Sequence, residues 1–242
     1  MEVTTIFNSL AETNFIEQLG KEKNLIFIGD LKIVSYLRNN LSSAENSREN
    51  HYFCWDFNLE SSLIDNIKSL SDRRAIIIVS SNNENEIYTN FQNLVTKLNI
   101  HLPVLRLFAD VFVNLSLGRS LIDSSQAIIK QPQLSYTILT TPRSGSTFLC
   151  AALQSTRIAG LPTEHLRQPA AVLAAYCNFD YLRYLQLMMS YKVTENNIFG
   201  TKIISHFLQT LQESKFDFDD LFDKHFSRFI YLVRKDKIAQ AV

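Results

Sequence analysis

The residue types that could do chemistry gather between Tyr136 and Cys150. An apolar run typical of a strand ends in the turn sequence Pro-Arg-Ser-Gly-Ser-Thr at 142–147, and a helix-compatible run follows. Because the first N–H groups of a helix have no intrahelical partner, such a strand–turn–helix can surround a phosphate or sulfate with donors. Gly145 lets the backbone approach the anion, and Arg143 adds a planar, permanent charge suited to tetrahedral oxyanions. Hydroxyl donors come from Ser144, Ser146 and Thr147.

Comparison with the familiar nucleotide-binding loop indicates which kind of anion the 142–147 turn would bind. The pattern G-x-x-x-x-G-K-[ST] brings a lysine to the outer phosphates, whereas residues 142–147 contain one glycine and no lysine. This difference argues against an ordinary ATP or GTP hydrolase and fits a loop that holds the 5′-phosphosulfate of an adenine nucleotide. The alternative is a Ser- or Thr-capped helix after a buried strand, which is a common arrangement.

More polar segments follow the loop in a fixed order. They are Gly-Leu-Pro-Thr-Glu at 160–164, Gly-Thr-Lys at 200–202, and an apolar run that ends in Arg-Lys-Asp at 234–236 and leads to Gln-Ala-Val at 240–242. The ordered set resembles the bacterial sulfotransferases typified by trehalose sulfotransferase, whose P/Q-R-S-G-S-T loop precedes G-x-P-x-E, G-x-K and R-x-D-x-x-x-Q-A-V. The resemblance covers 136–242, and its specificity depends on the whole set.

The resemblance implies a donor and an acceptor. The donor would be 3′-phosphoadenosine 5′-phosphosulfate (PAPS), and its sulfuryl group would pass to a hydroxyl, for example of a carbohydrate or glycolipid, without a metal. Residues Arg143 to Thr147 would hold the 5′-phosphate and the sulfuryl oxygens, where preorganised donors stabilise the charge that develops as the sulfur–oxygen bond breaks. Arg234 would pair with the 3′-phosphate; the alternative is an ordinary surface arginine.

A base and a second cation are also implied by the resemblance. Glu164 matches the family glutamate that acts as general base on the acceptor hydroxyl; alternatively it is a solvated loop residue or a cap partner for the next helix. His165 could serve instead, because neutral imidazole is a competent base. Lys202 matches the family lysine and would contact donor or acceptor oxygens, unless it is a surface lysine. If this segment is helical, His206 lies on the same face as Lys202.

The C-terminal end departs from the family pattern. In the related sulfotransferases a serine that contacts the 3′-phosphate follows Gln-Ala-Val, whereas this sequence ends at Val242. We therefore expect the helix that starts near Asp236 to stop after about two turns and the sulfotransferase sheet to be incomplete. Either the sequence is a fragment or the gene product is truncated.

The first 117 residues alternate apolar runs with helix-like segments. Strands are expected at 25–30, 52–57, 75–80 and 104–108, and helices at 31–40, 61–70 and 84–98. The run 75–80 is continuous and β-branched, which is typical of a strand buried on both faces. The first strand is followed by Gly29 alone, where the dinucleotide fingerprint needs three glycines. Asp30 and Asp56 lie at strand ends, where they could touch a ligand or cap a helix.

The sequence thus predicts an α/β protein with two domains, since strands that alternate with helices favour parallel sheets. Residues 1–117 would form a degenerate Rossmann-like domain with a regulatory, binding or docking role. Residues 118–135 would be a linker, and 136–242 the N-terminal part of a P-loop-like sulfotransferase domain.

Composition excludes some functions and fits an intracellular protein. With 24 basic and 24 acidic residues, no global field attracts nucleic acid or an anionic membrane. No apolar stretch approaches membrane-spanning length. The three cysteines lack metal-binding spacing and fit reduced core thiols in the cytoplasm. The oligomeric state stays open, although related enzymes often pair as homodimers.

Two tempting clusters have simpler explanations. Acidic residues at 217, 219, 220 and 223 alternate with apolar ones at helical spacing, so an amphipathic helix is favoured over a cation site. A second helical stripe favours core packing over a cofactor site, although its tyrosines could line an acceptor pocket. Its members are Tyr181, Tyr184, Leu185, Met188 and Met189.

The leading hypothesis is a PAPS-dependent sulfotransferase. A P-loop-type kinase would need Mg²⁺ ligands and a loop lysine, and neither is evident from the sequence. The third hypothesis is an inactive nucleotide-binding or docking module.

Overall fold

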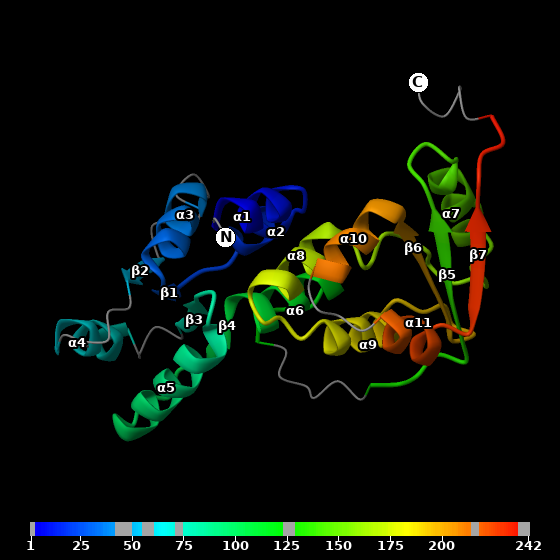
Figure 1. Cartoon of the computed structure of the whole chain (residues 1–242). Coiled ribbons are helices and arrows are strands. Elements are labelled where there is room, and N and C mark those ends of the chain that lie inside the picture. The colour runs from blue at the N-terminus through cyan, green and yellow to red at the C-terminus, as the bar shows by residue number, and fades with distance from the viewer. Residues whose placement is uncertain are drawn as a thin grey trace. The chain divides into compact units, whose positions relative to one another are not determined.

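The computed structural model describes residues 3–41, 50–54, 61–70, 75–122, 129–213 and 218–236 (Figure 1). The chain divides into two compact units. The N-terminal unit contains residues 1–124 and 176–179, and the C-terminal unit contains residues 125–175 and 180–242. The expected linker at 118–135 stays a prediction.

The N-terminal unit is built on a four-stranded sheet in the order β2-β1-β3-β4, with every neighbouring pair parallel. Its strands are β1 (Leu25–Gly29), β2 (His51–Cys54), β3 (Ile76–Ser80) and β4 (Val104–Arg106). Its helices are α1 (Val3–Ala11), α2 (Phe15–Leu19), α3 (Leu31–Leu41), α4 (Ser61–Leu70), α5 (Glu84–Lys97) and α6 (Val113–Leu117). The prediction of a parallel α/β sheet from alternating strands and helices is confirmed.

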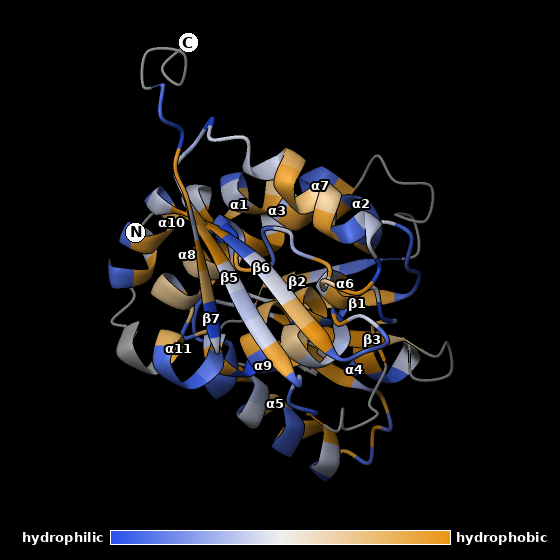
Figure 2. Cartoon of the chain, turned by 90° about the vertical axis from the view of Figure 1, so that its right-hand side faces the viewer, coloured by the Kyte–Doolittle hydropathy of each residue, from blue (hydrophilic) through white to orange (hydrophobic). Residues whose placement is uncertain are grey.

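Hydrophobic burial explains this sheet. Every residue of β1 and β3 is buried, as the continuous apolar run at 75–80 predicted. Helix α5 is amphipathic, with hydrophilic and hydrophobic residues along its turns (Figure 2). Its apolar stripe, made of Ile87, Phe91 and Val95, joins the same core cluster as β1 and β3.

The C-terminal unit contains a second parallel sheet, in the order β6-β5-β7. Its strands are β5 (Leu134–Thr140), β6 (Ile198–Ile204) and β7 (Arg228–Leu232). Its helices are α7 (Ser146–Ser155), α8 (Gln168–Tyr176), α9 (Tyr181–Tyr191), α10 (Ser205–Glu213) and α11 (Phe218–His225), although the last residue of α8 is assigned to the N-terminal unit. Two parallel sheets confirm the α/β fold class.

One expected strand is wrong at its end. The run 104–108 was expected to be extended throughout, but β4 stops at Arg106 and a π-helical segment, Leu107–Phe112, follows. The carboxylate of Glu84 accepts hydrogen bonds from the N–H groups of Phe108 and Ala109, at 2.9 and 2.8 Å. In a continued strand these N–H groups would donate to a neighbouring strand. Here they donate to Glu84 of α5, which stabilises the π-helical segment.

Other strand and helix expectations fare differently. Of the expected strand 52–57, residues through Cys54 are extended in β2, and 55–57, with Asp56, lie outside the described residues. The Tyr and Met stripe of α9 is buried, which confirms core packing. The acidic run near 220 lies in α11, as an amphipathic helix predicts, with Leu221 fully buried; Asp217 falls outside the described residues.

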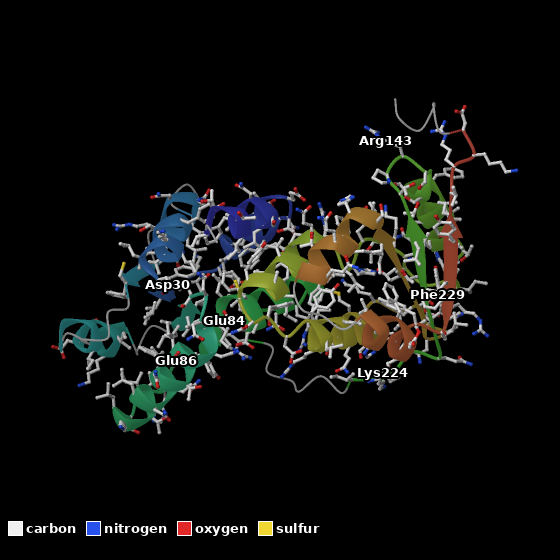
Figure 3. The ribbon with its side chains drawn as sticks, viewed as in Figure 1. Asp30, Glu84, Glu86, Arg143, Lys224 and Phe229 are labelled. Carbon is white, nitrogen blue, oxygen red and sulfur yellow. The ribbon has the colours of Figure 1, made fainter. Side chains whose placement is uncertain are left out.

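Glu84, labelled in Figure 3, is a buried acid at the start of α5, and its burial predicts a pH-dependent stability for the N-terminal unit. Burial raises the pKa of Glu84 from 4.5 to about 7, against the opposing effects of the two N–H donors and Arg106. Between these values the folded chain binds more protons than the unfolded chain, so the free energy of unfolding should fall as pH rises through this window. We expect Glu84→Gln to remove that fall, which is on the order of 2–3 kcal/mol. Urea unfolding of both proteins at pH 5, 6, 7 and 8 measures it, and parallel pH profiles would contradict the assignment.

Candidate anion-binding and catalytic site

The loop between β5 and α7 forms a tight, strained turn. Arg143 and Gly145 both have positive φ angles, 59° and 87°. The left-handed conformation at Gly145 favours glycine and places this residue at the N-cap of α7. No side chain among the described residues caps this end of the helix. The N–H groups of the first turn of α7 therefore remain available to an anion.

The space beside the loop is open. A Cβ atom added to Gly145 would meet no atom within 4 Å, and the residue is exposed. Ser144 is tied to the end of β5 by a hydrogen bond between its hydroxyl and that of Thr140. The loop thus combines fixed anchors with an unobstructed outer face, as an anion-binding turn requires.

Two exposed arginines lie at the same end of the C-terminal sheet. Arg143 stands at the tip of the loop, where its side chain points away from the strands (Figure 3). Arg234 follows β7, and its Nη1 lies 3.5 Å from the carbonyl oxygen of Arg143, to which it donates. The structure therefore brings together two residues that the sequence analysis placed in the same donor site from opposite ends of the unit.

Lys202 and Glu164 form an ion pair beside the first turn of α7. Lys202 Nζ lies 2.7 Å from Glu164 Oε1, and the lysine side chain is only 6% exposed, against 28% for the glutamate. The same Nζ atom lies 3.5 Å from the hydroxyl of Thr147. Lys202 is thus not a surface lysine, and Glu164 is not a freely solvated loop residue.

The segment that carries Glu164 is fixed by hydrogen bonds from several elements. The carbonyl oxygen of Thr163 accepts from the N–H of Lys202 at 2.8 Å and from the hydroxyl of Thr201 at 3.1 Å. Neighbouring carbonyls accept from side chains outside the segment at 2.6–2.8 Å: Asn196 to Ile158, Tyr136 to Ala159, Gln154 to Pro162 and Tyr184 to His165. Within the segment, the ring of His165 contacts the carbonyl oxygen of Leu161 at 2.9 Å. The backbone at Glu164 is therefore preorganised rather than loose.

Two glycines of the sequence motifs have packing roles that the sequence analysis missed. A Cβ atom on Gly160 would lie 2.9 Å from the backbone nitrogen of Gly200. A Cβ atom on Gly200 would lie 2.5 Å from the ring of Tyr136, whose hydroxyl donates to Ala159. The glycines let the segment before Glu164, strand β6 and this ring approach closely. The signal was present as Gly in both motifs, but the partner, Tyr136, lies far away in sequence.

The side chain of His165 is held by contacts within its own loop and with Phe199. Its Nε2 lies 2.9 Å from the carbonyl oxygen of Leu161, so this nitrogen carries the proton and donates, and its ring stacks on Phe199. Burial lowers the pKa of His165 to about 4. The ring is neutral near pH 7, but its contacts fix the loop and leave Glu164 beside Lys202. Of these two residues, Glu164 is thus the one whose side chain contacts Lys202.

The positions of His206 and Phe148 differ from what the sequence predicted. Lys202 belongs to strand β6 and His206 to helix α10, so the proposed shared helical face is wrong, and His206 is exposed. Phe148, from the apolar run that predicted α7, is 82% exposed in the first turn of that helix. An exposed aromatic ring beside an open loop is a candidate surface for stacking.

Within the described ranges, no group of three or more His, Cys, Asp or Glu residues is arranged to hold a metal ion. The helices in those ranges include none with both the length and the apolar character needed to cross a bilayer.

The close contact between Gly200 and Tyr136 can be tested by overpacking. We expect Gly200→Ala to lower the free energy of unfolding of the C-terminal unit by about 1–3 kcal/mol, because the new methyl group meets the aromatic ring. In a Tyr136→Ala background the same change should cost much less. Urea unfolding of the four proteins measures the difference, and an equal cost in both backgrounds would refute the contact.

Comparison with known proteins finds one family model that is similar to part of the chain. Neither the curated proteins nor the solved structures that were compared match the chain. Residues 135–242 match the family model described as Stf0 sulphotransferase. The part of the chain that contains the loop, Glu164, Lys202 and Arg234 is therefore similar to the Stf0 sulphotransferases.

Proposed function

We propose that the C-terminal unit transfers the sulfuryl group of PAPS to the hydroxyl of a small-molecule or glycolipid acceptor. The observation that carries the proposal is the Lys202–Glu164 ion pair beside Thr147, in the first turn of a helix whose N-terminus is open. A cation, a carboxylate and unpaired backbone donors thus converge where an anionic donor and a hydroxyl acceptor could meet. The match of residues 135–242 to a sulphotransferase family model supports the same chemistry.

The donor would bind along the loop and across to the end of β7. The N–H groups at the start of α7 and the Arg143 guanidinium suit the 5′-phosphate and the sulfuryl oxygens. The hydroxyls of Ser144, Ser146 and Thr147 would add further donors. Arg234 suits the 3′-phosphate, because its guanidinium lies within hydrogen-bond distance of the loop backbone. Exposed Phe148 offers its ring to the adenine base.

The transfer step assigns one role to each group. The acceptor oxygen attacks sulfur, and the bond between sulfur and the bridging oxygen breaks. The electron pair stays on the 5′-phosphate, where the donors of the loop and Lys202 stabilise the new charge. Glu164 takes the proton of the acceptor hydroxyl, since it is the carboxylate held beside this site. No metal takes part in this proposed step.

A kinase has less support than a sulfotransferase. The 142–147 loop has no lysine of its own, and Lys202 reaches its first helical turn from β6 instead. The family model that matches this unit is that of a sulphotransferase. We further propose that the protein acts in the cytoplasm, where PAPS would be its soluble donor.

Donor binding can be tested with a matched pair of arginines. Arg143 and Arg157 are both exposed and both have positive φ angles, 59° and 60°, but they flank opposite ends of α7. We expect Arg143→Ala to weaken the binding of adenosine 3′,5′-bisphosphate about tenfold to a hundredfold, since charge-assisted hydrogen bonds contribute about 1.5–3 kcal/mol. Arg157→Ala should change it less than twofold.

Isothermal titration calorimetry measures both affinities. Equal weakening by the two substitutions would remove Arg143 from the site. A folded protein that binds no bisphosphate would support the inactive-module hypothesis, and magnesium-dependent affinity for ATP would support a kinase.

The role of Glu164 can be tested by removing its charge. We expect Glu164→Gln to lower sulfuryl transfer at least a hundredfold, because general base catalysis contributes about 10²–10⁴-fold. Transfer of ³⁵S from labelled PAPS to a panel of sugars and glycolipids measures it. Glu195→Gln, at an exposed position of the same unit, makes the same charge change and should have little effect. Undiminished transfer by Glu164→Gln would exclude this residue as the base.

A further inference from the structure

Lys202 contacts two parts of the site at once. Its Nζ atom lies between Glu164 Oε1, at 2.7 Å, and the Thr147 hydroxyl, at 3.5 Å. An ammonium group has three donors, so it can bridge a carboxylate and a second acceptor. Thr147 is in the turn of α7 whose N–H groups face outward, so an anion at that turn would lie within reach of the same ammonium.

The burial of Lys202 makes the carboxylate important to its charge. A lysine side chain that is 6% exposed is desolvated, and Glu164 forms an ion pair with it. A buried cation without compensation is costly, and it attracts an anion strongly when one is available. An anionic donor and the Glu164 carboxylate would therefore compete for one cation.

We propose that Lys202 is shared between Glu164 and the bound donor, so that donor binding weakens the Lys202–Glu164 ion pair and makes the Glu164 carboxylate a stronger acceptor for the proton of the acceptor hydroxyl. The inference rests on the proposed sulfotransferase function and adds a regulation of the same site. Before the donor binds, the carboxylate of Glu164 is paired with Lys202. Once the donor engages Lys202, the carboxylate loses its cation and accepts the acceptor proton more readily.

The surrounding groups do not replace Lys202 in this role. Cys150 lies one turn after Thr147 on α7, and burial raises the pKa of its thiol, so it is neutral near pH 7. Lys202 and Glu164 act on that thiol in opposite directions, which agrees with their position near it. His165, next to Glu164 in the chain, is also neutral, because burial lowers its pKa to about 4. The charge balance therefore lies between Lys202, Glu164 and the donor.

The test is donor affinity in variants of matched charge. We expect Glu164→Gln to bind PAPS about tenfold more tightly, within the usual range of coupling between two sites, because the free charge of Lys202 turns to the donor. Glu195→Gln adds the same net charge at an exposed position and should change affinity less than twofold. Lys202→Met should weaken binding, and in the Lys202→Met background Glu164→Gln should no longer tighten it.

A second measurement covers the case in which Glu164→Gln does not fold. Calorimetry at pH 6 in buffers of different ionisation enthalpy gives the protons taken up when PAPS binds. Uptake by the unsubstituted protein should exceed that by Lys202→Met, and equal uptake would overturn the coupling.

The outcomes separate this inference from the proposed function. In one outcome, Arg143→Ala weakens PAPS binding while Glu164→Gln fails to tighten it. That result would support the donor site and contradict the sharing of Lys202. If the unsubstituted protein binds no PAPS, the proposed function and the coupling both fall.

Discussion

A lysine in the middle of a buried parallel strand needs a partner for its charge, and this need shapes the C-terminal unit. Lys202 is on β6, opposite Ile138 of the central strand β5, and it is buried. Its partner, Glu164, comes from an irregular segment rather than from a neighbouring strand. That segment must therefore run close along β6, and Gly160 and Gly200 permit the approach. The hydrogen bonds from Lys202 and Thr201 to the carbonyl oxygen of Thr163 then hold the next residue, Glu164, beside Lys202.

The sequence predicted the elements of this site better than their contacts. The turn between β5 and α7, both parallel sheets and the burial of β3 follow from local patterns of glycine, apolar residues and turns. The contact between Tyr136 and Gly200 depends on strands far apart in the chain, which periodicity cannot reveal. The π-helical turn after Arg106 was missed for the same reason, because a carboxylate from α5 supplies its hydrogen bonds. The roles of Arg143, Arg234, Glu164 and Lys202 are still predictions, although the structure places the first two near each other and pairs the last two.

The two sheets differ in what lies at their carboxyl ends, where parallel α/β sheets usually bind ligands. In the N-terminal sheet the order β2-β1-β3-β4 puts the change of direction between β1 and β3. There the Asp30 carboxylate accepts hydrogen bonds from the Ser81 hydroxyl and the Asn82 N–H, at 2.8 and 3.0 Å. Gly29 packs so tightly that a Cβ atom would lie 2.0 Å from the carbonyl oxygen of Ser80. The lone glycine serves packing between strands, and the aspartate joins the two loops.

The C-terminal sheet has the opposite arrangement, and this contrast agrees with our proposal of a donor site at the end of β5. The strand β5 ends in a turn whose glycine meets open space instead of a neighbouring strand. The acid nearby, Glu164, is drawn to a lysine rather than to the loop, so the N–H groups at the start of α7 keep no carboxylate of their own among the described residues. A carboxylate that accepted hydrogen bonds from this turn, as Asp30 does from the loop after β3, would repel any phosphate or sulfate from it. Because Glu164 is paired with Lys202, this turn carries no carboxylate among the described residues, which is the arrangement that our proposed anionic donor requires.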